Sequence, residues 1–323
     1  MNTRFLIGGL LALGLVLCSA GVSAGEVRDG DDLLNRPADR TYDRIIESGY
    51  LKVGVYKDFP PYSFEQDGEP RGIDVELGKR IARELGVDFR VHWIVPDEAL
   101  SDDLRNNVWK GHYLDKQRLA DVMMRVPYDK AYAYKQDSTG EYVNEQVHMF
   151  GPYQRETWQI AYDPSQLDSV QTVAVFQYHP IGVEIDTLPD FYLTSGLRGR
   201  MRDQVRHYRD VEEAFNAMRE GDVSAVMAMR SEIDFELGRP ENRAFRLAET
   251  GFPGIGKQVW DVGMAVKNNH RQLGYALEGI VDKLVKTGEM DQLFAGLGLR
   301  YGVPDYYREF LKPEALARAS GSD

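Results

Sequence analysis

The chain has 323 residues, of which 43% are hydrophobic and 28% charged, as in an ordinary globular protein, and it is long enough for one large domain or two lobes. Its formal net charge is −12. Nucleic acid and anionic membranes repel a chain this acidic, which argues against both as partners, whereas a local ligand site can still have either sign.

Residues 1–24 predict a secretion signal: Arg4 precedes an apolar run too short to span a bilayer, and small residues lead up to a cleavage site after Ala24. The only cysteine, Cys18, lies in this segment, so the mature chain has neither a disulfide nor a catalytic or metal-binding thiol. An exported, cysteine-free protein is expected in a bacterial periplasm. Residues 25–40 are charged and poor in apolar side chains, which predicts a flexible leader.

The most informative stretch predicts a strand, a stiff loop and an amphipathic helix. Apolar and other residues alternate over 51–55, as in a strand, and the run Asp-Phe-Pro-Pro-Tyr at 58–62 then interrupts it because proline fixes its own φ and restrains its predecessor. Apolar residues recur every four positions in the following helix, for which we predict Asp74 as the N-cap and Gly86 as the C′ residue.

Aromatic side chains surround this proline loop. In an α/β sheet, ligands bind outside the carboxyl ends of the strands, where such a loop lies. A ligand site here is therefore predicted to have an aromatic wall of Tyr56, Phe59, Tyr62 and Phe64; the alternative is that their rings pack into the core.

The rest of the chain alternates between strands and helices. The clearest helix runs from an Asp210 N-cap to Gly221, with apolar residues at helical spacing. A polar segment and a tyrosine-rich segment, 97–118 and 127–146, interrupt the pattern. Predicted strands cover 89–95, 119–124, 157–162, 172–177, 223–229 and 262–267; further helices cover 41–48 and 273–284, and a polar helix and tail follow from 304.

The opening LKVGVYKDFPPYSF with GIDVELGKRIA, and later AFNAMREGDVSAVMA, resemble family 3 of the periplasmic solute-binding proteins over residues 43–299. The resemblance implies a two-lobed α/β fold of the type II periplasmic-binding-protein class, each lobe a mixed sheet flanked by helices. It places lobe 1 at 41–156 plus 260–323 and lobe 2 at 157–259, joined by two crossover segments. It also implies a monomer outside the membrane that delivers a small polar solute to an ABC permease.

Three motifs of the amino-acid-binding members are missing. The resemblance would place a Thr-x-x-Arg carboxylate clamp after the strand at 119–124, a Gly-Thr after 172–177, and an ammonium-binding Asp after 223–229. This chain has Arg125-Val126-Pro127, Tyr178-His179-Pro180 and Arg230 at those places. An α-ammonium buried without a partner would cost several kcal/mol. We therefore predict a solute other than a plain amino acid.

Substitute ligand-binding residues follow from these positions. Arg125 and Arg230 are candidates for an anionic group, and a phenol or imidazole could bind a polar ligand; for each, surface exposure or loop packing is the alternative. With the aromatic wall, the candidate residues are Tyr56, Phe59, Tyr62, Trp109, Arg125, Asp129, Tyr178, His179 and Arg230.

Two other functions compete with the receptor. An accessory protein of the same fold could bind or mature a periplasmic PQQ-dependent (quinoprotein) alcohol or methanol dehydrogenase, using the extra surface at 97–118 and 127–146. A cleft-based enzyme similar to cyclohexadienyl dehydratase would need an acid–base group, for which Asp129 is the candidate. The six histidines have no metal-ligand spacing, so neither a metal nor a cofactor is expected, and a non-enzymatic role is favoured.

Overall fold

The computed structural model describes residues 39–311. The predicted signal at 1–24, most of the predicted leader at 25–40 and the predicted tail beyond 311 lie outside the described residues. Within the described range, no helix combines the length and apolar character needed to cross a bilayer.

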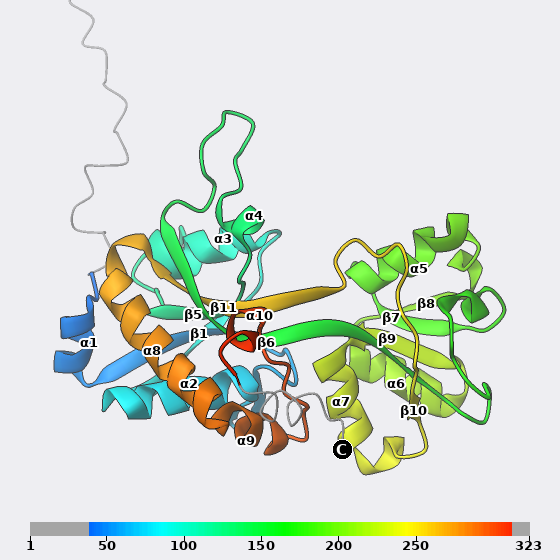
Figure 1. Ribbon diagram of the computed structural model, residues 1–323. Coiled ribbons are helices and arrows are strands. Elements are labelled where there is room, and N and C mark those ends of the chain that lie inside the picture. Colours follow the sequence, from blue (N-terminus) through cyan, green and yellow to red (C-terminus); the bar gives the residue numbers. More distant parts are fainter. Residues whose placement is uncertain (1–38, 312–323) are drawn as a thin grey trace, which may run out of the picture. The chain divides into compact units, whose positions relative to one another are not determined.

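Eleven strands form the sheets of the described part. They are β1 Tyr50–Tyr56, β2 Phe64–Gln66, β3 Glu69–Arg71, β4 Asp88–Ile94, β5 Val122–Pro127, β6 Val147–Tyr162, β7 Ile181–Glu184, β8 Val205–Tyr208, β9 Ala225–Met229, β10 Arg246–Leu247 and β11 Val259–Lys267. Nine of them make one mixed sheet in the order β4-β1-β5-β11-β6-β9-β7-β8, with β10 beside β6, and β2 pairs with β3 alone (Figure 1).

Helices flank this sheet. They are α1 Tyr42–Ser48, α2 Ile73–Leu85, α3 Leu100–Leu104, α4 Lys130–Ala133, α5 Leu188–Gly199, α6 Val211–Glu220, α7 Arg230–Gly238, α8 Arg271–Thr287, α9 Glu289–Ala295 and α10 Asp305–Arg308. A π-helical turn, Arg105–Trp109, extends α3.

The sheet belongs to two lobes with separate cores. In the first lobe, apolar side chains of α2, α8 and α9 pack on one face of β1 and β5, and those of α3 and its π-helical turn pack on the other. In the second lobe, α6 and α7 cover one face of β9, and α5 covers the other. Each half-sheet is thus sandwiched between helices, as the predicted fold requires.

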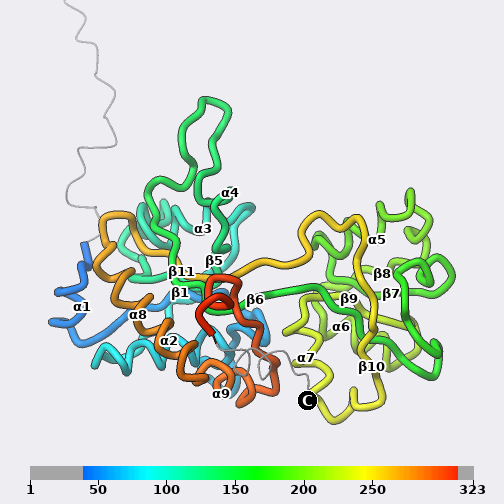
Figure 2. The backbone as a smooth tube through the Cα atoms, viewed as in Figure 1, coloured from blue at the N-terminus to red at the C-terminus, as the bar shows by residue number. Residues whose placement is uncertain are grey.

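A ribbon of two strands joins the lobes. The 16-residue β6 and the antiparallel β11 pair along most of their length and pass from the first lobe into the second (Figure 2). The sequence suggested a separate strand at 157–162, but it is the second half of β6.

Well-capped helices match the sequence predictions. The Asp210 side chain accepts a hydrogen bond from the Glu213 backbone N–H at the start of α6, and Gly221 ends this helix in the left-handed conformation. Gly86 ends α2 in the same way.

The predicted strand at 172–177 was wrong. Residues Val173–Gln177 form a 3₁₀ turn capped by the Thr172 hydroxyl, and the sheet instead takes β7, a few residues later. The β-branched residues favoured a strand, but Val173 and Phe176 are buried at a spacing of three, as a 3₁₀ turn requires.

The start of α2 also differs from the prediction. Its N-cap is Gly72, at φ 111°, and a Cβ there would lie 2.3 Å from the Tyr62 carbonyl oxygen, so only glycine fits. Asp74 lies in the first turn of the helix instead, and its carboxylate binds side chains from other elements.

Candidate functional site

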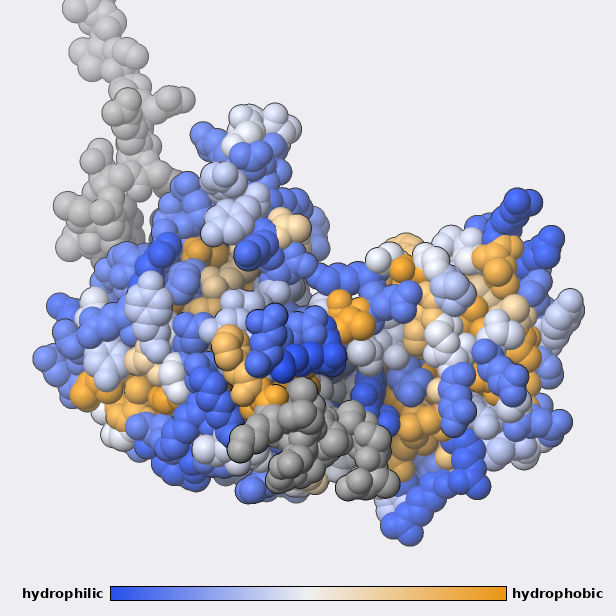
Figure 3. All heavy atoms as spheres, in the orientation of Figure 1, coloured by the Kyte–Doolittle hydropathy of each residue, from blue (hydrophilic) through white to orange (hydrophobic). Residues whose placement is uncertain are grey.

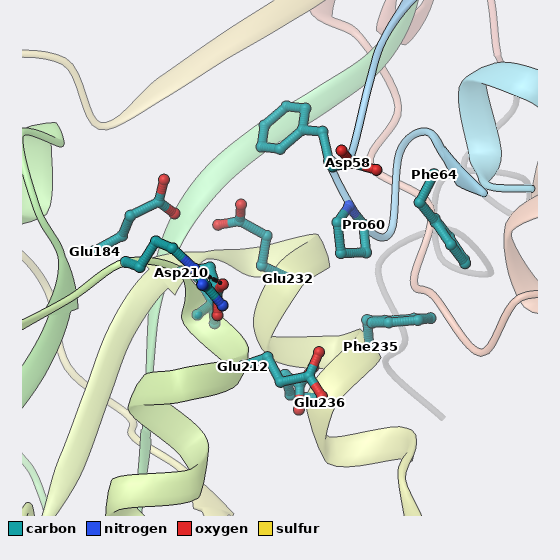
Figure 4. A pocket seen from close by; sticks show the side chains of 12 residues that line it. Asp58, Pro60, Phe64, Glu184, Asp210, Glu212, Glu232, Phe235 and Glu236 are labelled. Atoms are coloured by element: carbon teal, nitrogen blue, oxygen red, sulfur yellow. Dashed lines mark hydrogen bonds and ion pairs between the residues drawn. The ribbon is translucent and has the colours of Figure 1, made fainter. Parts of the chain in front are cut away.

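A cavity of about 540 Å³ lies between the lobes, beside the proline loop (Figure 4). The loop and β2 supply one wall, and the end of β7 and the first turns of α6 and α7 supply the other. Its lining residues are Asp58, Phe59, Pro60, Phe64, Glu184, Arg209, Asp210, Val211, Glu212, Glu232, Phe235 and Glu236. Six of the twelve are carboxylates, so the cavity is strongly acidic.

Three of these carboxylates already have cationic partners. Arg239 binds Glu212 at 2.8 Å and Glu236 at 3.1 Å, and Arg209 binds Asp210 at 3.1 Å. Among the described residues of the lining, Arg209 is the only cationic one, and its exposed side chain also binds a carboxylate of α6. This part of the chain therefore presents no free cation to a ligand in the cavity.

Glu184 and Glu232 have no ion pair in the described part of the chain. Figure 4 shows their carboxylates facing the same space, one from the end of β7 and the other from the first turn of α7. Burial and the nearby Asp210 raise the pKa of Glu184 to about 7. Burial and Glu184 raise the pKa of Glu232 well above its usual range. With the exposed Asp58, which has no ion pair among the described residues either, these two acids are the carboxylates of the lining that no cation neutralises.

A smaller apolar cavity of about 160 Å³ adjoins the first and shares Phe59, Glu184 and Glu232 with it. Trp158 of β6 and Met227 of β9 line it. A ligand held by the two acids would therefore have aromatic and aliphatic surface beside it, as small-molecule sites usually do.

Of the predicted aromatic wall, Phe59 lines both cavities and Phe64 lines the larger one. Tyr62 is fully buried beneath Phe59, with the two rings 4.8 Å apart, and its hydroxyl lies 3.7 Å from the Met229 sulfur of the second lobe. Tyr56 lines neither cavity: its ring packs edge-on against Phe59, with centroids 6.3 Å apart, and its hydroxyl donates to the Asp103 carboxylate of α3 at 2.7 Å.

Arg125 was expected just after a strand, but β5 continues through it because Val126 and Pro127 still pair with β11. Its guanidinium binds both Asp74 oxygens, at 2.7 and 3.0 Å, donates to Gln154 and stacks on the Tyr62 ring. The side chain is buried, and Asp74 already neutralises its charge. It is therefore not a free anion-binding group.

A buried polar network continues from Arg125 into the second lobe. Gln154 and Glu156, both on β6, bind each other, and Gln154 donates to the Ser231 hydroxyl of α7 at 2.9 Å. Ser231 in turn donates to Glu156. The second oxygen of Glu156, Oε2, is buried without a hydrogen-bond partner in the described residues. Burial raises the pKa of Glu156 to about 7.

Arg230 begins α7 and lies outside the cavity lining. Its Nε is 3.8 Å from Asp234, and burial and the nearby Arg300 lower its pKa. From the first lobe, the Arg300 guanidinium donates three hydrogen bonds to the same Asp234, and the Arg300 backbone N–H donates a fourth. Whether Arg230 binds a ligand stays a prediction.

Tyr178 and His179 were expected on a loop facing the cleft, but they precede β7, whereas Glu184 at the opposite end of this strand lines the cavity. Tyr178 is 78% exposed. The error follows from the strand predicted at 172–177, because the sheet takes β7 instead. The residues after β7 are Ile185, Asp186 and Thr187, and Thr187 lines the smaller cavity.

Trp109 and Asp129 are also remote from the cavity lining. Trp109 packs at the edge of the core beneath α3. The Asp129 carboxylate caps α4 and binds Lys257, and this hydrogen bond is the main reason why its pKa is lowered. A general acid needs the opposite shift, so the structure argues against an acid–base role for Asp129.

We expect Asp129→Asn to leave solute binding unchanged, because asparagine also caps helices and the lost ion pair is on the surface. Isothermal titration of both proteins with the solute released from the native protein would check this. An affinity loss of tenfold or more would return Asp129 to the site.

Sequence reasoning missed the acids that line the cavity. Glu232 is the first acid after β9, but Arg230 and Ser231 separate it from the strand, so it did not match the Asp that the family resemblance placed after this strand. Nothing in the sequence marked Glu184 as a cavity residue, because the strand it ends, β7, was predicted at 172–177. Asp210 was predicted correctly as the N-cap of a helix, but not as a residue of the cavity lining.

Comparison with known proteins decides the family. A model of the bacterial extracellular solute-binding proteins, family 3, matches residues 51–296. The chain belongs to this family. It is therefore a solute-binding protein with a bilobal fold, as the sequence predicted.

Individual relatives are distant. The L-cystine-binding protein TcyJ of Escherichia coli (strain K12) is 24% identical over 288 residues, 88% of this chain and 91% of TcyJ. Cyclohexadienyl dehydratase of Pseudomonas aeruginosa is 30% identical, but over only 39% of this chain and 43% of that enzyme. A solved ancestral cationic amino acid solute-binding protein, AncCDT-1, has a TM-score of 0.61 at 17% identity, covering 79% of this chain and 98% of that one.

Proposed function

We propose that the protein is a periplasmic receptor, exported with a signal cleaved after Ala24, that captures a small polar solute other than a plain amino acid for an ABC-type importer. The solute binds in the cavity between the lobes, and lobe 2 spans about residues 157–259. The chain needs no cofactor and acts as a monomer.

One observation carries the ligand part of this proposal: among residues 39–311, no cationic side chain of the cavity is free to pair with an α-carboxylate. Arg125 is neutralised by Asp74, and Arg209 is exposed and bound to two acids. A carboxylate entering the cavity would leave water and lie beside Glu184 and Glu232, and an unpaired buried charge costs several kcal/mol. An ammonium group, in contrast, would find carboxylates in the cavity, although the Asp of the amino-acid-binding members is missing after β9.

Native mass spectrometry of the mature chain, purified gently from its own periplasm, tests the receptor. We expect a small adduct that leaves on denaturation, and its mass identifies the solute. A mature protein that carries no small molecule, and that gains no thermal stability from any solute in a periplasmic extract, would contradict the receptor function.

A second candidate is the dehydrogenase accessory protein. The segment that follows α4 projects from the first lobe (Figure 1), and Figure 3 shows that its surface is mainly hydrophilic. Tyr134 and Tyr142 are exposed on it, with ring centroids 6.1 Å apart. Paired exposed tyrosines are typical of protein interfaces and are unnecessary for solute binding.

Co-purification with the periplasmic PQQ-dependent dehydrogenase distinguishes this candidate. If the accessory function is correct, the wild type retains the dehydrogenase on a column and Tyr134→Ser/Tyr142→Ser does not, while both bind solute equally. Retention of the dehydrogenase by neither protein would reject this function.

A further inference from the structure

We infer that the cavity binds an organic cation, an amine or guanidinium without a carboxylate, between the side chains of Glu184 and Glu232. This inference rests on the proposed receptor function and names the class of its ligand.

The two acids differ from the other carboxylates of the cavity in their surroundings. Glu232 is 6% exposed, and its Oε2 accepts the Met229 backbone N–H at 2.9 Å. Its Oε1 accepts no hydrogen bond from residues 39–311, yet the side chain lines both cavities. A carboxylate oxygen on a cavity wall with no donor from the protein is available to an N–H group of a ligand.

Glu184 lies on the same wall of the cavity, at the end of β7, and its carboxylate faces the same space as that of Glu232 (Figure 4). It too lacks an ion pair among the described residues, and the groups around it in the cavity are mostly acidic: Asp210, Glu212 and Glu232, with Arg209 turned to solvent and paired. Two converging carboxylates provide acceptors for several N–H donors of one ammonium or guanidinium group.

The neighbouring walls fit the rest of such a ligand. Phe59 and Trp158 line the smaller cavity beside the two acids. Aromatic faces attract cations and cover the aliphatic part of an amine, so they favour this ligand over an anion of the same size.

Agmatine and L-arginine form a matched pair of probes, because they share the guanidinium and differ in the α-carboxylate. In calorimetric titrations of the mature chain, we expect agmatine to bind at least about tenfold tighter than L-arginine. 1,4-Diaminobutane tests an ammonium in the same way, and glutarate tests an anion.

Variants locate the site. Glu184→Gln and Glu232→Gln keep hydrogen-bond acceptors but remove the charge, and each is expected to weaken the tighter cation by at least about tenfold. Glu220→Gln, at the exposed end of α6, makes the same charge change outside the cavity and is expected to leave affinity unchanged. Thermal unfolding of each variant checks that it folds.

Affinity should also depend on pH, because the cation competes with protons. The pKa of the empty Glu184 is about 7, so binding should weaken at least about tenfold from pH 8 to pH 5.5. In Glu184→Gln this dependence should be smaller.

The outcomes separate the two proposals. If glutarate or L-arginine binds more tightly than both amines, or if both glutamate variants bind the cation like the wild type, the cation site is wrong while the receptor function stands. If none of the four probes binds and the periplasmic chain carries no solute, both are wrong.

Discussion

Replacing Arg125 by methionine is expected to lower the free energy of unfolding by about 3 to 5 kcal/mol, the usual cost of removing one partner of a buried ion pair. Methionine fills a similar volume, so the loss would come from charge. Asp74 is 1% exposed and would keep only the Tyr153 hydroxyl as a donor at 2.8 Å. Gln154 and the Tyr62 ring would lose their contacts with the guanidinium as well.

Urea unfolding followed by circular dichroism measures this change. Arg308→Met is a suitable control, because it breaks an exposed pair with Asp305 and should cost no more than about 1 kcal/mol. The double variant Asp74→Asn/Arg125→Met removes both charges and should be more stable than Arg125→Met alone. A single variant that is as stable as the Arg308 control would show that Asp74 finds another partner.

Replacing Glu156 by glutamine is expected to stabilise the protein at pH 8 by up to about 3 kcal/mol and to change little at pH 5. The pKa of Glu156 is about 7 in the folded protein, against 4.5 for the ordinary group. A raised carboxyl pKa gives stability that is fully present below pH 4.5 and is lost as the pH rises through 7. Each unit of pKa difference between the folded and unfolded states corresponds to about 1.4 kcal/mol, so the stability that the wild type loses by pH 8 is about 3 kcal/mol.

The structure favours this exchange. Glutamine retains the oxygen that accepts from Gln154 and Ser231, and its amide replaces Oε2, which has no partner. The comparison requires urea midpoints of both proteins at pH 5 and pH 8. Other carboxyl groups with a raised pKa, such as Glu184, are present in both proteins, so their contributions cancel in the difference between the two unfolding free energies. Parallel pH profiles would mean that Glu156 is not protonated near neutrality.

Local signals allowed much of the fold to be predicted. Asp210 and Gly221 mark the two ends of α6, and the sequence shows both because helix capping depends on adjacent residues. The alternation of apolar and other residues along β1 likewise identifies a strand. The family resemblance supplied the two-lobed arrangement. The strand at 172–177 failed because intrinsic β propensity is weaker than the packing that drew Val173 and Phe176 into a 3₁₀ turn.

The site depended on long-range packing and was mostly not predictable. Arg125 is adjacent in space to Asp74, 51 residues earlier, and no local pattern indicates that its charge is already neutralised. Glu184 and Glu232 come from different elements and meet only because β7 and β9 are parallel neighbours in the sheet. Phe59 and Phe64 were the predicted residues that reached the cavity, because they lie on and just after a proline loop whose conformation is fixed locally.

The ribbon of β6 and β11 has a mechanical consequence. Bending it within the plane of the sheet would stretch backbone hydrogen bonds on one edge, whereas twisting leaves them nearly intact, and two-stranded ribbons are the sheets that twist most. The irregular pairing at Val262–Met264 adds local freedom to this twist. We therefore expect the second lobe to rotate about the long axis of the ribbon. A ligand would then be enclosed by twisting of the two strands and not by a hinge motion at a loop.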